Sequence, residues 1–518
     1  MKTILWIALL AGLWLPSGWS QAGMLDPSFG RGGWVHTDFG GKDQASAIAV
    51  QPDGKLLVGG RTNASGAFDF ILARYTADGQ LDTGFGNQGK LTWDFGSGQE
   101  NIEYIKVLAD GKILWGGYSN TNPNSHSIIM RLHPDGSPDS DFAAQGFVKY
   151  RFGRSTGPLE CALQSDGKYV VSHLGVIDSF DVDWIIARFL PDGQLDSSFN
   201  QTGYRKHNFL TREDIPFHVQ VLKDGKIFAT GCAGVYPNVD FAFLRLHPDG
   251  SLDDSFGNGG SVQTDFYDNQ DVAYGAVVLD DGRIMVSGTA RDSLTNYDFG
   301  LARYLPDGQL DSSFGVNGKR SFDFKGPVDY GFYMIRQPDG KFLVNGINSI
   351  LTKNSYVVAR FFENGDLDTG FGTNGLAVMD VVNIAPDNTP KFTVQADGKI
   401  LVVANYKDGT NINFLIARFL NDQTTHVGDP DAQPSLIQAY PNPFRDELIL
   451  QIDPQVPNAP ITLEICDGLG RILKTWTWNP LEQGYRIHLN ESIKNMQGVV
   501  MLRWRSGLQT GTIPLFKG

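Results

Sequence analysis

Few patterns in the sequence have the residue types and spacing of a catalytic centre. Residues 153–157 match the G-x-S-x-G pattern of a serine nucleophile. That pattern works where a strand-to-helix turn exposes the serine beside an oxyanion hole, but here it falls between two expected strands with no helix after it. The nine histidines are scattered, and none has a partner at metal-ligand spacing such as H-E-x-x-H. The sequence therefore predicts no catalytic residue, no metal ligand and no cofactor, and it favours a protein that is not an enzyme.

Acidic loops, such as those around Asp78 and Asp249, contain the oxygen ligands that calcium takes. One aspartate of these loops, however, recurs at the same position about every 57 residues, as Asp82, Asp139, Asp196, Asp253, Asp311 and Asp368. An aspartate that every repeat needs is more simply a turn cap that accepts local N–H groups, or a partner for an arginine that recurs in step. The repetition therefore favours a structural role over calcium binding.

Residues suited to binding lie in segments that differ from one repeat to the next. Loops on a rigid scaffold carry function more often than the scaffold does. Aromatic and asparagine side chains suit stacking on sugars or packing against a protein, and the alternative is surface loops that vary without a function. The candidates in these segments are Tyr118, Asn120, Tyr236, Asn238, Asn296, Tyr297 and Tyr406.

A second set of candidates lies on the first strand expected in each repeat, where side chains approach a central channel. These residues are Tyr104, Glu160, His218, Tyr274, Tyr333 and Lys391, and we count His218 and Tyr333 among the binding candidates. Their types differ between repeats, so they predict either a pocket without symmetry or a channel lining that binds only water.

The elements that position these residues are set by a sevenfold repeat. The dipeptide Asp-Gly followed by Lys or Arg recurs at intervals of 56 to 58 residues, beginning at Asp53, Asp110, Asp166, Asp224, Asp281, Asp339 and Asp397. A fixed period of this size indicates a solenoid, a propeller or an array of domains.

One repeat contains four short strands, expected at residues 47–51, 55–59, 70–75 and 90–95. Each is bounded by turn residues, and Asp-Gly and Asn-Gly supply the positive φ that tight hairpins need. No stretch carries a capped, helical apolar period. Four antiparallel strands repeated seven times predict an all-β fold, a seven-bladed β-propeller.

The two ends of the repeat region complement each other. The seventh repeat stops after Asp422 without its fourth strand, and residues 25–30 and 34–39 supply the missing loop and strand. We therefore expect the N-terminal strand to complete the last blade, which closes the ring and removes two free sheet edges.

Composition and charge narrow the function classes. The chain has 518 residues, of which 61 are glycine and 12% are aromatic, a mixture that suits many short strands. Its formal net charge of −14 argues against sequence-independent binding to nucleic acid. Three cysteines exclude a disulfide-rich scaffold, and buried free thiols are favoured over a single disulfide.

The domain boundaries follow from the two ends of the chain. Lys2, an apolar run over residues 4–15 and small residues before Gly23 predict a signal peptide at 1–22, with an uncleaved anchor as the alternative. The propeller is expected at 23–423, a linker at 424–435 and a small C-terminal Ig-like β-sandwich at 436–518. No later segment resembles a membrane span, so we expect a secreted protein that reaches the outer surface or the medium through the periplasm.

The repeated phrase resembles a known family. Residues 50–60, Leu72-Ala73-Arg74-Tyr75 and residues 81–86 are similar to the delta-60 repeat family of β-propellers, and the resemblance covers about residues 24–422. It implies the propeller fold and an extracellular location, and it implies no activity.

The C-terminal region resembles the sorting domain of the type IX secretion system of Gram-negative bacteria. The motif consists of Tyr440, Pro441, Asn442 and Pro443, followed by Gly470 and Arg471. This sequence departs from the family at Val499, where an aromatic residue is usual. The resemblance implies that type IX machinery is a partner, and that the domain is removed after export. An ordinary carbohydrate-binding or fibronectin-like sandwich is the alternative.

Together these features predict a secreted bacterial cell-surface β-propeller that binds a glycan or a protein without catalysis. A propeller that hydrolyses or cleaves polysaccharides, and a structural or adhesive surface protein, are the alternatives.

Overall fold

The structure is a computed structural model that describes residues 22–422, apart from 97, 122–123, 144, 154, 177–181, 210–212, 293–295, 327, 351–352 and 380–389. Beyond residue 422 it describes seven strands. The chain divides into two compact units, Met1–Asp422 and Gln423–Gly518. No helix among the described residues is long and apolar enough to cross a membrane.

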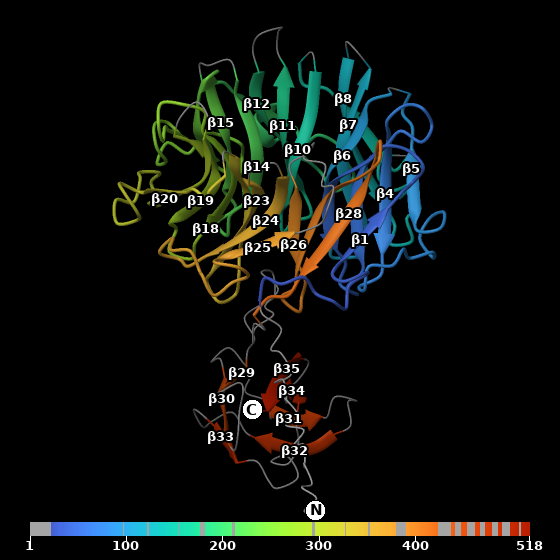
Figure 1. The fold of residues 1–518 in the computed structure, drawn as a ribbon, viewed down its shortest axis with the longest axis vertical. Coiled ribbons are helices and arrows are strands. Elements are labelled where there is room, and N and C mark those ends of the chain that lie inside the picture. The colour runs from blue at the N-terminus through green and yellow to red at the C-terminus, as the bar shows by residue number, and fades with distance from the viewer. Residues whose placement is uncertain are drawn as a thin grey trace, which may run out of the picture. The chain divides into compact units, whose positions relative to one another are not determined.

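The first unit is a ring of seven four-stranded antiparallel blades, which confirms the predicted fold class (Figure 1). The blades are numbered along the chain, from blade 1, which begins with β2, to blade 7, which begins with β26. Blades 1 to 3 consist of β2–β5 (Asp43–Val50, Leu56–Thr62, Asp69–Tyr75, Lys90–Trp93), β6–β9 (Glu100–Val107, Ile113–Thr121, Asn124–Leu132, Phe147–Tyr150) and β10–β13 (Ser155–Leu163, Tyr169–Val176, Val182–Phe189, Tyr204–His207). Blades 4 to 6 consist of β14–β17 (Ile215–Val221, Ile227–Val235, Asn238–Leu246, Ser261–Thr264), β18–β21 (Val272–Val278, Ile284–Arg291, Tyr297–Tyr304, Lys319–Phe322) and β22–β25 (Val328–Arg336, Phe342–Ile350, Lys353–Phe361, Leu376–Met379). Blade 7 consists of β26–β28 (Lys391–Val394, Ile400–Asp408, Asn411–Phe419) together with β1 (Trp34–Thr37).

The repeated Asp-Gly turn joins the first two strands of each blade. In blade 1 the Gly54 N–H donates to the Gln51 carbonyl at 2.8 Å, and Gly54 has a φ of +83°. Any residue with a Cβ is strained at this φ, so glycine is required there. The strand bounds differ slightly from the prediction: β2 begins at Asp43, four residues before the predicted start at 47. The reason is that the Asp43 carboxylate accepts the Phe39 N–H at 2.6 Å and so holds the entry to the strand in place.

The N-terminal strand completes the last blade, as predicted. β1 pairs antiparallel with β28, with Trp34 opposite Ala417 and Thr37 opposite Phe414 (Figure 1, β1 in blue beside β28 in orange). The Arg418 guanidinium also lies 2.9 Å from the Asp26 carboxylate, a pair that joins the two ends of the repeat region. The closed ring leaves no free edge between its first and last blades.

The core lies between successive blades, where β-branched, leucine and aromatic side chains of neighbouring sheets interlock. Trp115 and Trp184 are among the largest fully buried side chains. The Phe70 ring of blade 1 packs on Trp115 of blade 2 with ring centroids 5.0 Å apart. Each blade therefore buries its apolar face only against its neighbours, as expected of a repeat array.

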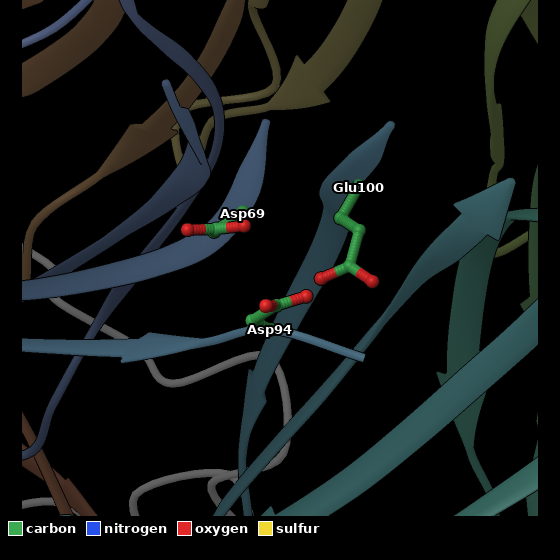
Figure 2. A group of neighbouring side chains, drawn as sticks. All are labelled: Asp69, Asp94 and Glu100. Atoms are coloured by element: carbon green, nitrogen blue, oxygen red, sulfur yellow. The ribbon is translucent and has the colours of Figure 1, made fainter. Parts of the chain in front are cut away.

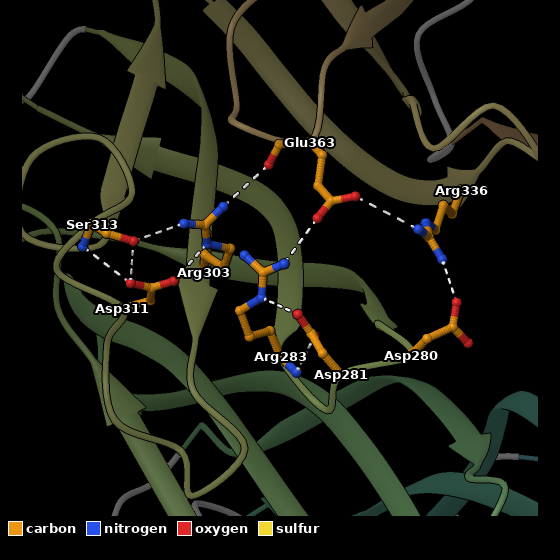
Figure 3. A network of polar contacts seen from close by, with 8 residues as sticks. All are labelled: Asp280, Asp281, Arg283, Arg303, Asp311, Ser313, Arg336 and Glu363. Carbon is orange, nitrogen blue, oxygen red and sulfur yellow. Dashed lines mark hydrogen bonds and ion pairs between the residues drawn. The ribbon is translucent and has the colours of Figure 1, made fainter.

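At the end of the strands that carries the Asp-Gly turns, arginine and aspartate side chains connect each blade to the next. Figure 3 shows these contacts between blades 5 and 6. In blade 5 the Arg303 Nε lies 2.8 Å from Asp311, and the same guanidinium donates to the Glu363 carbonyl of blade 6. The other oxygen of Asp311 accepts the Ser313 N–H at 3.0 Å. The repeated aspartate thus fills both structural roles that the sequence left open, as a turn cap and as the partner of the arginine.

Seven such pairs are present, at distances of 2.6 to 2.9 Å: Arg74–Asp82, Arg131–Asp139, Arg188–Asp196, Arg245–Asp253, Arg303–Asp311, Arg360–Asp368 and Arg418–Asp26. The hydrogen bonds and positive charges around Asp196 outweigh its burial and lower its pKa to about 2. A carboxylate occupied in this way is not a free calcium ligand.

The second unit contains two antiparallel sheets, the number expected for a small β-sandwich. One sheet has the order β29–β30–β33 (Ile437–Tyr440, Glu447–Ile452, Tyr485–His488). The other has the order β32–β31–β34–β35 (Ile472–Trp478, Ile461–Cys466, Gly498–Ser506, Gln509–Lys517).

Candidate functional site

The first strand of most blades carries a bulge that turns side chains toward the central channel. The register of β6 against β7 shifts between Ile102 and Tyr104, and that of β14 against β15 shifts between Pro216 and His218. Equivalent shifts occur in β2, β10, β18 and β22. A bulge places an extra residue opposite one partner and so re-aims the side chains that follow it.

These strands line a channel cavity of about 210 Å³. Five of the six channel residues expected from the sequence surround it, namely Tyr104, Glu160, His218, Tyr333 and Lys391. Lys106, Ile335 and Thr393 also line it, and they lie near the ends of their strands. The cavity therefore extends toward the Asp-Gly turns.

Charge in the channel is concentrated on one carboxylate between two lysines. The Glu160 carboxylate lies 3.0 Å from the Lys106 ammonium and 3.6 Å from that of Lys391. Although burial opposes ionisation, the two lysines and His218 lower the pKa of Glu160 to about 2. The Lys391 ammonium also lies 3.6 Å from the centre of the Tyr333 ring, a cation–π contact.

At neutral pH the neighbouring His218 and Cys161 are neutral, whereas Glu103 is partly ionised. Burial lowers the pKa of His218 to about 4, and burial raises the pKa of Cys161 to about 12. Burial also raises the pKa of Glu103 to about 7, against the hydrogen bond from Asn101 and the attraction of Lys391. The channel therefore holds two ammonium groups against one permanent carboxylate, an arrangement that suits an anionic group better than a cation.

A second cavity of about 160 Å³ lies at the opposite end of the strands, between blades 5 and 6. It is lined by Gln270, Val272, Tyr274, Thr289, Tyr297 and Tyr330. The Tyr297 hydroxyl donates to the Gln270 side chain at 3.2 Å, and its ring lies 4.9 Å from that of Tyr330. The Arg291 guanidinium stacks on the Tyr297 ring, 4.7 Å from its centre. Aromatic rings with a few amide and hydroxyl groups at their edges can bind a sugar ring.

The remaining variable-loop candidates are spread around the ring. Tyr236 is 61% exposed and Asn238 is exposed beside it, whereas Tyr406 is half-buried against His36, with ring centroids 5.1 Å apart. Tyr118 is half-buried in blade 2, and Asn120 is exposed two residues further on.

Asn296 lies next to Tyr297 and donates to the Asp298 carboxylate at 3.0 Å. Of the seven variable-loop candidates, only Tyr297 lines one of the two cavities.

Other sequence candidates lie outside the described residues. In the G-x-S-x-G segment Arg154 is not described, and Ser155 and Thr156 are described only as backbone. Tyr440 ends β29, while Pro441, Asn442, Pro443, Gly470 and Arg471 of the sorting motif are not described.

Cys161 and Cys232 are buried free thiols, as predicted.

Sequence reasoning did not single out Lys106, Glu103, Thr289 or Tyr330. Lys106 follows Tyr104 by two residues on the same strand, so strand alternation after the bulge was the available signal. Tyr330 reaches its cavity because β22 meets β20 through a parallel bridge between Val328 and Tyr297, a contact between blades that no local pattern reveals.

Three groups of carboxylates lie between blades, and none of their residues lines either cavity. They are Asp69 with Asp94 and Glu100, Asp240 with Asp265 and Asp271, and Asp298 with Asp323 and Asp329. In each group, oxygens of the three side chains lie within 4.8 Å of one another. Figure 2 shows the first group, in which the carboxylates of Asp94 and Glu100 face each other beside that of Asp69.

With this geometry in view, the comparison with protein families is informative. The family model described as "Domain of unknown function (DUF5122) beta-propeller" matches the chain seven times, over residues 51–85, 108–142, 164–199, 222–256, 279–314, 337–371 and 395–422. The repeats are those of a β-propeller repeat family. Each match begins at or near the Asp-Gly turn, and the first six end at or near the phenylalanine that follows the paired aspartate. The matches span the second and third strands of each blade with the loop between them, and the channel residues Glu160, His218 and Lys391 lie outside the matched ranges.

Solved structures with related folds were also found, and no curated protein matches the sequence significantly. The polysaccharide lyase Uly1 is 10% identical with a TM-score of 0.44, over 75% of this chain and 98% of the lyase. Sqt1 from Chaetomium thermophilum is 11% identical with a TM-score of 0.39, over 72% of this chain and 84% of Sqt1.

PorZ, a surface component of the type IX secretion system of Porphyromonas gingivalis, is 10% identical with a TM-score of 0.23, over 91% of this chain and 81% of PorZ. At such values these likenesses carry no argument about the activity of this chain.

Proposed function

We propose that the chain is a secreted, cell-surface carbohydrate-binding propeller that does not act on its ligand. The observation that carries this proposal is the aromatic cavity between blades 5 and 6. Tyr297 and Tyr330 form two of its walls, and Gln270 and Thr289 supply polar groups beside them. A volume of about 160 Å³ is below the roughly 300–1,000 Å³ of pockets for larger ligands, so the cavity would take no more than one sugar ring or the end of a chain of sugars.

The chemistry of that cavity supports binding without catalysis. Among the described residues, its lining contains no carboxylate and no histidine. Glycoside hydrolysis in most families uses a pair of carboxylic acids on either side of the scissile bond. A ligand bound between Tyr297 and Tyr330 would therefore be held by stacking and hydrogen bonds alone.

The test is a glycan array followed by titration calorimetry with the full chain. We expect Tyr297→Ala and Tyr330→Ala each to weaken binding at least tenfold, because each removes a stacking surface. Tyr267→Ala is the matched control, since Tyr267 is 41% exposed and lies outside the cavity. Unchanged binding in both cavity variants contradicts the proposed site, and silence across the array favours the adhesive or protein-binding alternative.

We propose further that the chain is exported by type IX machinery and that residues 436–518 are removed on the way. The support is the sorting-motif resemblance at residues 440–443 and 470–471, together with the predicted signal peptide at 1–22. Expression of the full chain in a type IX-competent bacterium, with and without residues 436–518, tests this proposal by cell fractionation and mass spectrometry of the mature termini. Retention of the truncated form in the periplasm supports it, and equal export of both forms contradicts it.

A second candidate function, polysaccharide cleavage, rests on the channel. His218 is neutral at neutral pH, and Lys106 and Lys391 lie close enough to neutralise a substrate carboxylate once Glu160 is displaced. These are the groups that proton abstraction next to a carboxylate requires. Incubation of the full chain with uronate-containing polysaccharides should then yield new reducing ends that are lost in His218→Asn. No new ends from the native chain would exclude this candidate for the polymers tested.

A further inference from the structure

In the first of the three carboxylate groups between blades, two residues hold a loop in place, whereas the third, Asp69, has no evident structural task. Glu100 accepts the Phe95 N–H at 3.0 Å and the Ser119 hydroxyl at 3.0 Å, so it holds the loop that enters β6. Asp94 accepts the Gly96 N–H at 2.6 Å and caps the same loop. Asp69, by contrast, stands on the third strand of blade 1 and is 8% exposed.

One oxygen of Asp69 lacks a hydrogen-bond partner. Its Oδ2 accepts the Ser65 hydroxyl at 2.6 Å, while its Oδ1 is buried and has no partner among the described residues. A buried carboxylate oxygen that is left unpaired costs free energy. The cost is greater here because two further carboxylates lie within 4.8 Å. A cation bound among the three carboxylates would offset this cost, because it would pair with the Asp69 oxygen and reduce the repulsion between the negative charges.

Blade 3 shows how the same position is neutralised when the protein supplies its own cation. Asp183 is the counterpart of Asp69, since each lies two residues before the partner of the third residue of its outer strand. In blade 3 that third residue is Lys206, and its ammonium lies 2.6 Å from the Asp183 carboxylate. In blade 1 the third residue is Thr92.

The three blades that contribute the carboxylate groups all lack this lysine. The third residue of the outer strand is Thr92 in blade 1, Gln263 in blade 4 and Ser321 in blade 5. In the four blades with an aspartate at the Asp69 position, that aspartate lies beside either this lysine, as in blade 3, or two further carboxylates, as in blades 1, 4 and 5.

We propose that Asp69, Asp94 and Glu100 bind a calcium ion between blades 1 and 2, and that the two equivalent groups bind one each. Calcium takes oxygen ligands at about 2.3–2.6 Å, so two ligands on opposite sides of one ion lie about 5 Å apart, in keeping with the spacing found here. Carboxylates without histidine or cysteine favour such a hard cation over zinc. The ion clamps the loop between β5 and β6 to the third strand of blade 1.

Trp93 makes the first site separately observable. It directly precedes Asp94, whereas the residues that precede the loop aspartates of the other two groups are Thr264 and Phe322. Terbium is a luminescent substitute for calcium, and a nearby tryptophan sensitises it. With the full chain freed of metal by a chelator, we expect tryptophan-sensitised terbium emission that calcium displaces. Calorimetry should give a Kd in the range of about 10⁻⁴–10⁻³ M, which is typical of extracellular calcium modules.

Two variants test the site from opposite directions. Asp69→Asn removes the unpaired carboxylate, and Thr92→Lys places an ammonium where blade 3 has Lys206. Each should weaken the tryptophan-sensitised signal at least tenfold. Thr92→Lys should also raise the melting temperature in chelator while abolishing the further rise that calcium gives at this site. Val378→Lys is the matched control, because it adds the same charge at the same strand position of blade 6.

The outcomes separate cleanly. Loss of the signal in Asp69→Asn and Thr92→Lys, with binding retained in Val378→Lys, supports the site. The proposal is overturned by an absence of calcium binding at millimolar concentrations, by native affinity in both site variants, or by equal loss in the control. Near-ultraviolet circular dichroism of each variant in chelator distinguishes lost binding from lost folding.

Discussion

The two ends of the propeller strands obey different rules. At the Asp-Gly end, seven arginine–aspartate pairs repeat with distances that differ by only 0.3 Å. Toward the channel and the opposite end, equivalent positions carry Tyr104, Glu160, His218 and Tyr333. Repetition of a residue type around the ring thus marks a contact that every blade needs. Divergence marks the places where the ring is free to specialise.

The repeated end and the channel also differ in how their charged groups are satisfied. The guanidinium and carboxylate of each pair are nearly buried and satisfied by several hydrogen bonds, so the pair acts as part of the core. The channel charges are satisfied mainly by one another across blades. Removing a charge from the repeated end should therefore cost more free energy of unfolding than removing one from the channel.

We expect Arg303→Ala to lower the free energy of unfolding the most. The change leaves Asp311 buried without its partner and removes the contacts with Glu363 and Phe314. Breaking a buried ion pair by removing one member costs about 3–5 kcal/mol. Chemical denaturation measures it, with exposed Arg31→Ala as a control that should stay within about 0.5 kcal/mol of the native chain. Arg418→Ala should cost as much as Arg303→Ala, and a much smaller loss would show that ring closure does not depend on the Asp26 pair.

We expect Glu160→Gln to lower the free energy of unfolding by a smaller amount, about 2 kcal/mol. The variant leaves Lys106 and Lys391 without the carboxylate between them. The pKa of Glu160 is about 2 in the folded protein and 4.5 in the reference state, so its contribution is complete above pH 4.5. That contribution is lost as the pH falls toward 2. The difference between native and variant stability should therefore shrink between pH 5 and pH 2.5.

The control for this experiment is Glu213→Gln, because Glu213 is exposed. It should leave stability within about 0.5 kcal/mol of the native value at every pH. A difference between native and Glu160→Gln chains that does not change with pH would contradict the ion-pair interpretation.

The repeated end is also the part of the molecule that the sequence predicts best. The Asp53 turn, the Arg74–Asp82 spacing and the missing fourth strand after Asp422 are local patterns, and each recurs seven times or is needed once to close the ring. Repetition made them visible without any knowledge of packing. The predicted role of the repeated aspartate followed because a single cause had to explain every copy.

The candidate sites were only partly accessible to sequence reasoning. Glu160 and Lys391 were placed on inner strands correctly, but their ion pair joins blades 3 and 7, which are 231 residues apart in sequence. The bulges shift side-chain alternation by one residue, so Lys106 and Glu103 were not recognised. The carboxylate groups combine a third strand, a loop and the first strand of the next blade, and no window along the chain contains that arrangement as a motif.

Asp240→Asn should stabilise the metal-free chain, which is the opposite of the usual effect of a mutation. Burial, Asp265 and Asp268 raise the pKa of Asp240 from 3.8 to about 6, so its contribution to stability is present below pH 3.8 and is lost as the pH rises to 6. Asparagine mimics the protonated form. After allowance for solvent screening we expect a gain of about 1 kcal/mol at pH 8 in chelator.

The matched comparison is Asp183→Asn in blade 3, which should destabilise the chain because it leaves Lys206 unpaired. Opposite signs for the two variants would confirm that the same strand position carries an excess of negative charge in blade 4 and a balanced charge in blade 3. Equal signs would contradict the contrast from which the calcium proposal is argued.

The smallest effect is expected for Tyr236→Ala at the variable end. Tyr236 is 61% exposed, so its removal should change stability by less than about 0.5 kcal/mol. Tyr304, which is 1% exposed at the repeated end, should cost about 3–5 kcal/mol when replaced by alanine. Thermal and chemical unfolding of both variants measures the contrast directly. A large loss in Tyr236→Ala would mean that this loop supports the fold, and the variable end would then no longer be the part of the ring that is free to bind a ligand.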